Sequence, residues 1–369
     1  MKIISVETIL LKLPYESGGA TRLIGGQPTN ELDMLLIRVD TDDGLTGWGE
    51  AFGHAVVRAT KTALDTMIAP SLIGRDATDI AGLMLDLQRN LHIFGRNGAV
   101  SYGLSGIDIA LWDLAGKRAG RPLYQLLGGA PRQRLHAYAS LRRYGDAQVV
   151  AANAKAAVAR GYCSIKIHEV QLDNIRAVRR AIGPDVKLFL DTNCPWTVEE
   201  AAANAAALRA EDIALFEEPI WPPEDYQGLA KLRAAGIATA AGENISGLCH
   251  FRHLFEANSV SVVQPSVTKV GGVTAMREIL ALADAFGVEV MPHCGYFGPG
   301  YLAVLHITGA MAGDVLFERL YLDLKESPFS PWTEAQDGMV NIPQAPGLGC
   351  EPDMDIVARY RLGPPSITR

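Results

Sequence analysis

Seven polar residues end apolar runs of the chain at a nearly constant interval. They are Lys166, Asp191, Glu217, Glu243, Ser266, His293 and Glu318, and successive members are 25, 26, 26, 23, 27 and 25 residues apart. Three consecutive members, Asp191, Glu217 and Glu243, are acids. Three carboxylates held at one place repel strongly unless a cation lies among them, and an all-oxygen ligand set suits Mg²⁺ before Mn²⁺. The spacing therefore predicts a divalent metal site, in preference to three solvated acids paired with local bases.

The run that precedes Asp191, SIKIH, carries two groups that could move protons. Lys166 and His168 are two residues apart, so on a strand both side chains point to the same side. By itself, such a Lys/His pair is most simply interpreted as part of a solvent-exposed strand face. Because the pair lies one interval before Asp191, however, we favour an inward orientation in which both side chains lie beside the metal. His293, which follows Pro292 at the end of a later run, is a candidate acid or base.

The interval itself predicts the fold that positions these residues. About 25 residues is the length of one strand, one helix and two loops, so each step is typical of one βα unit. Parallel strands of such units present their carboxyl ends to one place, which in a (β/α)₈ TIM barrel is the active-site face. We expect the barrel to start near Leu135, in RLHAYAS. The Ala-rich TVEEAAANAAALRAE, in which Thr197 and Glu200 are spaced as a capping box, is expected to be one of its helices.

A different pattern precedes the barrel. Residues 1–50 alternate by twos and contain Asp43-Gly44, a hairpin signal, whereas residues 56–128 show helical spacing. Between the first expected strands, the glycine-rich ESGGATRLIGGQPTN is either a plain connector or a lid. The tail is rich in Pro and Gly and is expected to pack back on the N-terminal module. We therefore expect an α+β capping domain over residues 1–128, a TIM-like barrel over 129–325 and a C-terminal tail over 326–369.

Composition excludes several classes of protein. With 369 residues, 48% of them hydrophobic and 20% charged, the chain can bury the core of one or two domains. A formal net charge of −7 without a dense Lys/Arg patch argues against a nucleic-acid or acidic-membrane partner. Five cysteines without a CxxC pair, an N-terminus unlike a leader and the lack of an apolar run of about 18 residues predict a cytoplasmic protein without a membrane span.

The chain resembles the mandelate racemase/muconate lactonizing enzyme branch of the enolase superfamily over nearly its whole length. The resemblance is carried by TGWGEA and SGIDIALWDLAGK before the barrel, by DTN, FEEP and AGEN around the three acids, by KVGG after the sixth strand and by PGLG in the tail. It implies a modified (β/α)₇β barrel with a capping domain that the tail completes. It also implies Mg²⁺ bound by Asp191, Glu217 and Glu243, a small-molecule carboxylate substrate, and a homo-oligomer between a dimer and an octamer.

The same resemblance implies roles for four further residues near the metal. Lys166 and His168 occupy the two places of the family's Lys-x-Lys motif. His293 matches a base on the opposite face of the substrate, and Glu318 matches a hydrogen-bond donor to the substrate carboxylate. These four residues are the candidate catalytic groups.

Two capping loops that govern specificity in the family have counterparts here. They are the stretch from Gly18 to Gln27 and the AFGHA stretch that follows Glu50, and the match favours the lid over the plain connector. Asn193 matches a polar residue near the substrate. The candidate substrate-binding residues are Asn193, Ser266 and His54.

Two departures from the family pattern bear on the reaction. The second Lys of Lys-x-Lys is His168, and the sixth-strand Asp that pairs with the histidine in the mandelate racemase group is Ser266. The sixth-strand Lys of muconate lactonizing relatives is missing as well, and Lys269, three residues later, is interpreted as structural. Without a carboxylate partner to raise its basicity, His293 is better suited to donate a proton than to abstract one. Abstraction is then expected from the face of Lys166 and His168.

Together these features predict Mg²⁺-dependent removal of the proton next to a substrate carboxylate, through an enediolate. Loss of a β-oxygen, as in the dehydration of a hydroxy- or sugar acid, is the favoured outcome, and a cycloisomerase or a racemase/epimerase is the alternative. A binding protein without activity would not need three acids in register. A His-ligated hydrolase would carry HxH on the first strand, where HAYAS has only His136.

Overall fold

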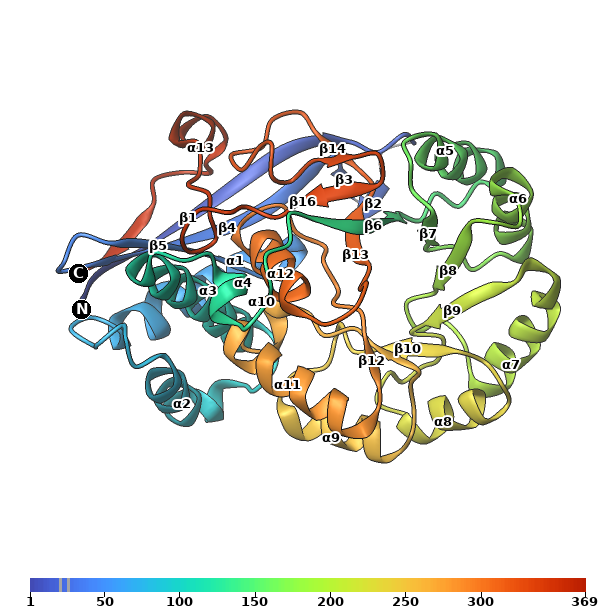
Figure 1. Cartoon of the computed structure of the whole chain (residues 1–369), viewed down its shortest axis with the longest axis horizontal. Coiled ribbons are helices and arrows are strands. Elements are labelled where there is room, and N and C mark those ends of the chain that lie inside the picture. Colours follow the sequence, from blue (N-terminus) through green and yellow to red (C-terminus); the bar gives the residue numbers. More distant parts are fainter. Residues whose placement is uncertain (20–21, 25–26) are drawn as a thin grey trace.

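The computed structural model describes residues 1–19, 22–24 and 27–369. Figure 1 shows two packed parts, an N-terminal sheet with helices beside it and a ring of strands enclosed by helices. Both chain ends lie on the side of the N-terminal sheet. Within the described part of the chain, no helix combines the length and apolar character needed to cross a membrane.

The N-terminal part is an antiparallel sheet that the tail completes. Its strands are β1 (Ile3–Glu16), β4 (Glu31–Thr41) and β5 (Thr46–Ala51), with β14 (Asp323–Leu324) and β17 (Ser366–Thr368) paired to β1. The predicted hairpin between β4 and β5 is confirmed, and Gly44 takes the positive φ of 86° that its turn requires. The tail therefore returns to the N-terminal module, as expected.

Helices cover one side of this sheet. They are α1 (Val57–Ala63), α2 (Ile80–Leu91), α3 (Ala99–Ala119) and α4 (Leu123–Leu126). The TGWGEA strand β5 lies directly against α3, because a Cβ atom at Gly49 would be only 2.0 Å from the backbone oxygen of Gly106. On its other side α3 packs against the barrel helices that follow β11 (Val262–Val263), so α3 lies between the capping sheet and the barrel.

The second part is a barrel of parallel strands in sequence order. The strands are β6 (Arg134–Leu141), β7 (Ser164–Ile167), β8 (Lys187–Asp191), β9 (Ile213–Glu217), β10 (Thr239–Ala241), β11 (Val262–Val263), β12 (Glu289–Val290) and β13 (Phe317–Leu320). Neighbours pair in that order from β6 to β12, and β13 pairs with β6. This is the predicted eight-stranded arrangement.

Helices connect the barrel strands on the outside. They are α5 (Ala147–Ala159), α6 (Leu172–Ile182), α7 (Val198–Ala207), α8 (Tyr226–Ala234), α9 (Leu248–Glu256), α10 (Val267–Val270), α11 (Gly272–Phe286) and α12 (Pro299–Ala310). The predicted capping box of α7 is confirmed, with Thr197 and Glu200 bonded reciprocally. After β13 the chain goes to β14 of the capping sheet without an intervening helix, which is the (β/α)₇β pattern.

Two details differ from the sequence interpretation. The stretch MVNIP contains β16 (Met339–Asn341), which with β15 (Ala335–Gln336) pairs with the barrel strand β6, so the tail contacts both parts. The glycine-rich first capping loop contains a short hairpin of β2 (Arg22–Ile24) and β3 (Gln27–Thr29). Residues 20–21 and 25–26 of that loop lie outside the described residues. The domain limits at residues 128 and 325 stay predictions.

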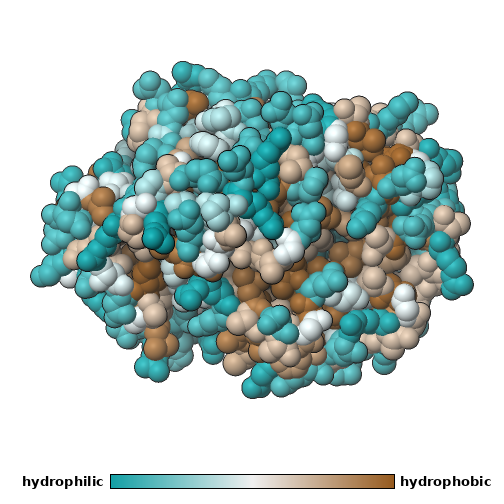
Figure 2. Space-filling model, in the orientation of Figure 1, coloured by the Kyte–Doolittle hydropathy of each residue, from teal (hydrophilic) through white to brown (hydrophobic). Residues whose placement is uncertain are grey.

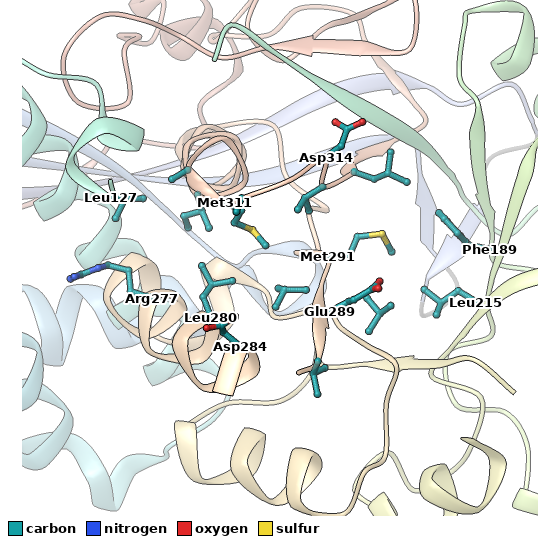
Figure 3. A pocket seen from close by; sticks show the side chains of 18 of the residues that line it. Leu127, Phe189, Leu215, Arg277, Leu280, Asp284, Glu289, Met291, Met311 and Asp314 are labelled. Carbon is teal, nitrogen blue, oxygen red and sulfur yellow. The ribbon is translucent and has the colours of Figure 1, made fainter. Parts of the chain in front are cut away.

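The amino-terminal end of the barrel is hollowed and apolar. A cavity of about 930 Å³ is lined by strand residues such as Phe189, Leu215 and Met291 and by residues of α11 and α12 (Figure 3). Hydrophobic residues gather over the lower centre of this face, within an otherwise largely hydrophilic surface (Figure 2). Lys187 and Glu289, which begin their strands, also line the cavity, so it lies at the end of the barrel opposite the predicted site.

Candidate active site

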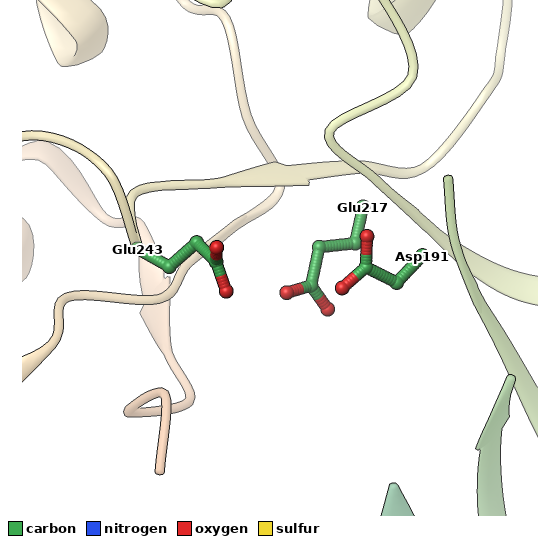
Figure 4. A group of neighbouring side chains, drawn as sticks. All are labelled: Asp191, Glu217 and Glu243. Carbon is green, nitrogen blue, oxygen red and sulfur yellow. The ribbon is translucent and has the colours of Figure 1, made fainter. Parts of the chain in front are cut away.

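The three predicted acids meet at the carboxyl ends of neighbouring strands. Asp191 and Glu217 are the last residues of β8 and β9, and Glu243 follows β10 by two residues. One carboxylate oxygen of each lies within 4.8 Å of those of the other two, and Figure 4 shows the groups converging from the three strand ends. Asp191 and Glu217 are almost fully buried. The sequence prediction that these residues come together is confirmed.

The charges in this cluster fit a divalent cation. Burial, and then the charge of Asp191, raise the pKa of Glu217 well above its usual range. The donor set is all oxygen, as a hard ion such as Mg²⁺ requires. The arrangement is therefore suited to hold such an ion.

Lys166 extends into the barrel beneath the acids. Its Nζ is 2.9 Å from Glu217 Oε2, 2.7 Å from Glu318 Oε1 and 3.6 Å from Asp191 Oδ2. Burial by itself would lower the pKa of Lys166, but the charges of Glu217 and Glu318 outweigh burial and hold that pKa well above the usual value. Lys166 is therefore a fixed cation in this structure.

Glu318 lies within β13 beside Lys166 and is ionised. Although burial favours the neutral acid, the charge of Lys166 lowers the pKa of Glu318 to about 2. The backbone N–H of Cys294 donates to Glu318 Oε2 at 2.8 Å. Glu318 is an acceptor in this arrangement, so the predicted donation to a substrate carboxylate would require Glu318 to take up a proton.

His168 lies on the same side of the cluster as Lys166. Its Nδ1 donates to the backbone oxygen of Leu141, which directs Nε2 toward Asp191 Oδ2 at 3.0 Å. The prediction that Lys166 and His168 face inward together is confirmed by these contacts. A cation and an imidazole thus stand on one wall of the site.

His293 stands on the opposite wall, against Glu243. Its Nε2 is 3.0 Å from Glu243 Oε2, and its Nδ1 is 3.3 Å from both Ser266 Oγ and Tyr296 Oη. The hydroxyls of Ser266 and Tyr296 are hydrogen-bonded to each other. We refer to these two residues as the hydroxyl pair. The sequence interpretation placed Ser266 at His293 but missed Tyr296, whose only signal is its place three residues after the histidine.

The remaining predicted residues have different environments. The backbone and side-chain nitrogens of Asn193 donate to Asp191 Oδ1 at 3.0 and 2.9 Å, so Asn193 orients a carboxylate of the cluster. His54 is exposed on the second capping loop, with its ring 5.3 Å from that of Phe52. Direct substrate contacts of Asn193, Ser266 and His54 stay predictions.

Lys269 lies closer to the chemistry than its structural interpretation implied. Its Nζ is 3.8 Å from Glu243 Oε1, donates to Asn244 Oδ1 at 3.0 Å and lies 4.5 Å from the centre of the Phe52 ring. Because Phe52 belongs to the second capping loop, Lys269 couples that loop to the carboxylate cluster.

Comparison with known proteins agrees with this geometry. The model of the mandelate racemase/muconate lactonizing enzyme N-terminal domain matches residues 25–128, and that of the enolase C-terminal domain-like family matches residues 149–356. The chain therefore belongs to the mandelate racemase/muconate lactonizing enzyme family of the enolase superfamily. It is an enzyme of this superfamily, in which the named relatives are dehydratases and cycloisomerases.

Three relatives illustrate the similarity. D-galactarolactone cycloisomerase from Agrobacterium fabrum is 33% identical over 390 residues, covering 99% of this chain and 100% of the relative. Arabinonate dehydratase from Saccharolobus solfataricus is 29% identical over 353 residues, covering 92% of this chain and 94% of the relative. The crystal structure of a mandelate racemase/muconate lactonizing protein from Paracoccus denitrificans, complexed with magnesium, superposes with a TM-score of 0.85 at 29% identity, covering 98% of both chains.

Proposed function

We propose that the protein removes the proton next to the carboxylate of an acid sugar and then expels the β-oxygen, most simply as a dehydratase. The observation that carries this proposal is the placement of Lys166 and His168 on one side of the carboxylate cluster and His293 on the other. Support comes from relatives named for the dehydration or cycloisomerisation of acid sugars. Expulsion of a β-oxygen is common to both outcomes, because cycloisomerisation is the same elimination within a ring.

Asp191, Glu217 and Glu243 are the proposed Mg²⁺ ligands. When bound, the ion would supply positive charge where negative charge accumulates on the substrate carboxylate. Support comes from the all-oxygen cluster and from the relative crystallised with magnesium. Mn²⁺ would satisfy the same oxygen ligands.

The chain's own residues then divide the proton transfers. Abstraction occurs from the wall of Lys166 and His168, and the Lys166 cation stabilises the enediolate. As the bond from the β-carbon to oxygen breaks, His293 delivers a proton to the leaving oxygen, so that a β-hydroxyl departs as water. Racemisation is disfavoured, because it needs a base on each wall, and the Nδ1 of His293 faces a neutral hydroxyl pair while its Nε2 faces Glu243, one of the proposed metal ligands.

The test is solvent-deuterium exchange of the α-proton with purified protein, Mg²⁺ and a panel of aldonic, aldaric and anhydro-sugar acids. We expect at least one acid to exchange its α-proton and to form a 2-keto-3-deoxy acid or the isomeric ring-opened product, with loss of both signals on chelation. Exchange that persists fully in chelator, or failure of every acid to exchange, would refute the proposal.

We further propose a cytoplasmic homo-oligomer, between a dimer and an octamer. The family suggests the assembly, and the widely spaced cysteines, which are free in the structure, support a reducing compartment. Sedimentation at micromolar concentration tests the assembly, and a monomer there would contradict it.

A further inference from the structure

The inner face of β6 leads from the carboxylate cluster to the mouth of the barrel. Tyr138 pairs in register with Glu318, and its ring lies 5.7 Å from Lys166 Nζ, so Tyr138 faces the interior. Ser140 pairs in register with Lys166. Arg142 directly follows the last residue of β6, Leu141, at the carboxyl end of the strand, and its Nη1 donates to Ser17 Oγ beside the first capping loop, so Arg142 lies at the mouth of the barrel.

Within the described part of the chain, Arg142 has no anionic partner. Its Nη1 donates to Ser17 Oγ at 2.8 Å and lies 3.4 Å from Tyr15 Oη, and its buried Nε has no hydrogen-bond partner among the residues that the structure describes. Of the ion pairs formed by described residues, none includes Arg142. The sequence from Ser17 to Asn30, which includes the undescribed loop residues, contains no Asp or Glu. A half-buried guanidinium without a counter-charge is costly, and its planar fork fits a carboxylate.

A second unsatisfied polar group lies on β6, two residues before Arg142 and level with Lys166. Ser140 is 1% exposed, and no described residue forms a hydrogen bond with its Oγ. Buried hydroxyls are normally paired, so an orphan at this place is suited to a hydroxyl of a bound ligand. Two residues of strand advance by about 6.6 Å. The five carbon–carbon bonds of a six-carbon acid, each about 1.5 Å long, place its two terminal groups a similar distance apart. An acid of this length therefore reaches from the level of Lys166 and Ser140 to that of Arg142.

The space around Arg142 is already formed. A cavity of about 350 Å³ at the root of the first capping loop is lined by Tyr15, Glu16, Ser17, Gly18, Arg142 and Lys325, among others. Lys325 faces the carboxylate of Glu16 there, with its Nζ 3.9 Å from Glu16 Oε1. Tyr144 Oη donates to the backbone oxygen of Ser17 at 2.6 Å, and Asn153 Nδ2 donates to that of Gly18 at 2.9 Å. These bonds fix the loop root, so the cavity holds on a fixed frame one guanidinium, that of Arg142, that forms no ion pair with a described residue.

We propose that the substrate carries a second anionic group at the end remote from the reacting carboxylate, and that Arg142 binds this group and determines specificity. The inference rests on the proposed function and extends it from acid sugars in general to dianionic ones. Aldaric acids or their lactones supply a terminal carboxylate, and phosphorylated aldonic acids supply a terminal phosphate with the same chemistry.

Arg143, the adjacent arginine, has a different task. It donates to the backbone oxygens of His168 and, at 2.8 Å, of Thr192, so it holds the ends of two barrel strands together. It is therefore unsuitable as a control. Arg160 is the matched control, since it is exposed and pairs with Asp323 at 3.0 Å on the outer surface.

The experiment compares wild type, Arg142→Met, Arg142→Lys and Arg160→Met, each loaded with Mg²⁺. Six-carbon aldaric acids, aldonic acids of the same configuration and their terminal phosphates are tested for kcat/KM, for α-proton exchange and for the rise in Tm that each acid produces. We expect wild type to prefer dianionic acids. Arg142→Met should lower kcat/KM for them by about 100-fold or more and abolish their additional Tm rise, while values for aldonic acids change less than about threefold.

Arg142→Lys should retain part of the preference, because it keeps the charge but loses the fork, and Arg160→Met should match wild type. Preference for a phosphorylated acid over an aldaric acid would support the inference and identify the anion as phosphate. If wild type handles aldonic acids equally well, or if Arg142→Met weakens both classes alike, the inference is overturned while the proposed function stands. If no acid exchanges its α-proton, both are overturned.

Discussion

The phenol oxygen of Tyr296 lies 3.3 Å from Nδ1 of His293. It shares that nitrogen with Ser266 Oγ, also at 3.3 Å, and the two hydroxyls are hydrogen-bonded to each other. The histidine is thus oriented by a neutral hydroxyl pair, where the mandelate racemase pattern would place a carboxylate. A neutral partner fixes the ring without adding a charge that would make it a stronger base.

Tyr296→Phe removes one of the two hydroxyls that orient His293. We expect kcat to fall by about 10- to 100-fold with little change in KM, because the ring loses orientation while substrate binding remains. Steady-state kinetics with the best acid of the panel measures this. Tyr162→Phe is the control, since that buried phenol packs on Tyr321 and not on His293. Equal losses in both variants would show that the effect is only structural.

His293→Asn separates the two proton transfers. Abstraction is assigned to the wall of Lys166 and His168, so exchange of the α-proton should persist while net turnover falls steeply. Deuterium exchange and product formation are measured on the same sample. If exchange disappears in His293→Asn but survives substitution of both Lys166 and His168, the assignment of the two walls is reversed.

Asp191→Asn, Glu217→Gln and Glu243→Gln each remove one charge from the cluster. Turnover should fall on the order of 1,000-fold or more. The metal-free variants should remain folded, because removing a charge relieves repulsion among the carboxylates. Wild-type Tm should rise with Mg²⁺ concentration, and this rise should be lost or weakened in each variant. A variant that kept full activity without added Mg²⁺ would show that the metal site is misassigned.

His306 makes stability depend on pH away from the active site. Burial lowers its pKa from 6.5 to about 4, with Leu348 O accepting from Nε2 at 3.1 Å and the backbone N–H of Tyr124 donating to Nδ1 at 3.3 Å. Between these pKa values the unfolded chain binds the extra proton, so the free energy of unfolding falls as pH drops from 6.5 toward 4, by on the order of 3 kcal/mol.

His306→Gln tests this assignment. Glutamine offers one donor and one acceptor but does not titrate, so its stability should depend less on pH over that window. Urea unfolding at a series of pH values, with both proteins free of metal, measures the difference. Parallel curves for wild type and variant would contradict the assignment.

Much of the site could be predicted from the sequence because parallel βα units return the chain to the same face at each step. That repetition alone places Asp191, Glu217 and Glu243 at neighbouring strand ends, with Lys166 and His168 one strand earlier and His293 across the barrel. Local signals likewise specified the Asp43-Gly44 hairpin and the capping box of α7, since both depend on residues only a few positions apart.

Other features depend on contacts that no local pattern encodes. Tyr296 reaches His293 through the path of the loop after β12, and Arg142 meets Ser17 only because the capping domain lies over the barrel mouth. The strand β16 pairs with the barrel because the tail passes beside β6 before it returns to the cap. Periodicity thus determined which residues stand at the strand ends, whereas the partners of those residues were decided by loop paths and domain packing, which depend on tertiary structure alone.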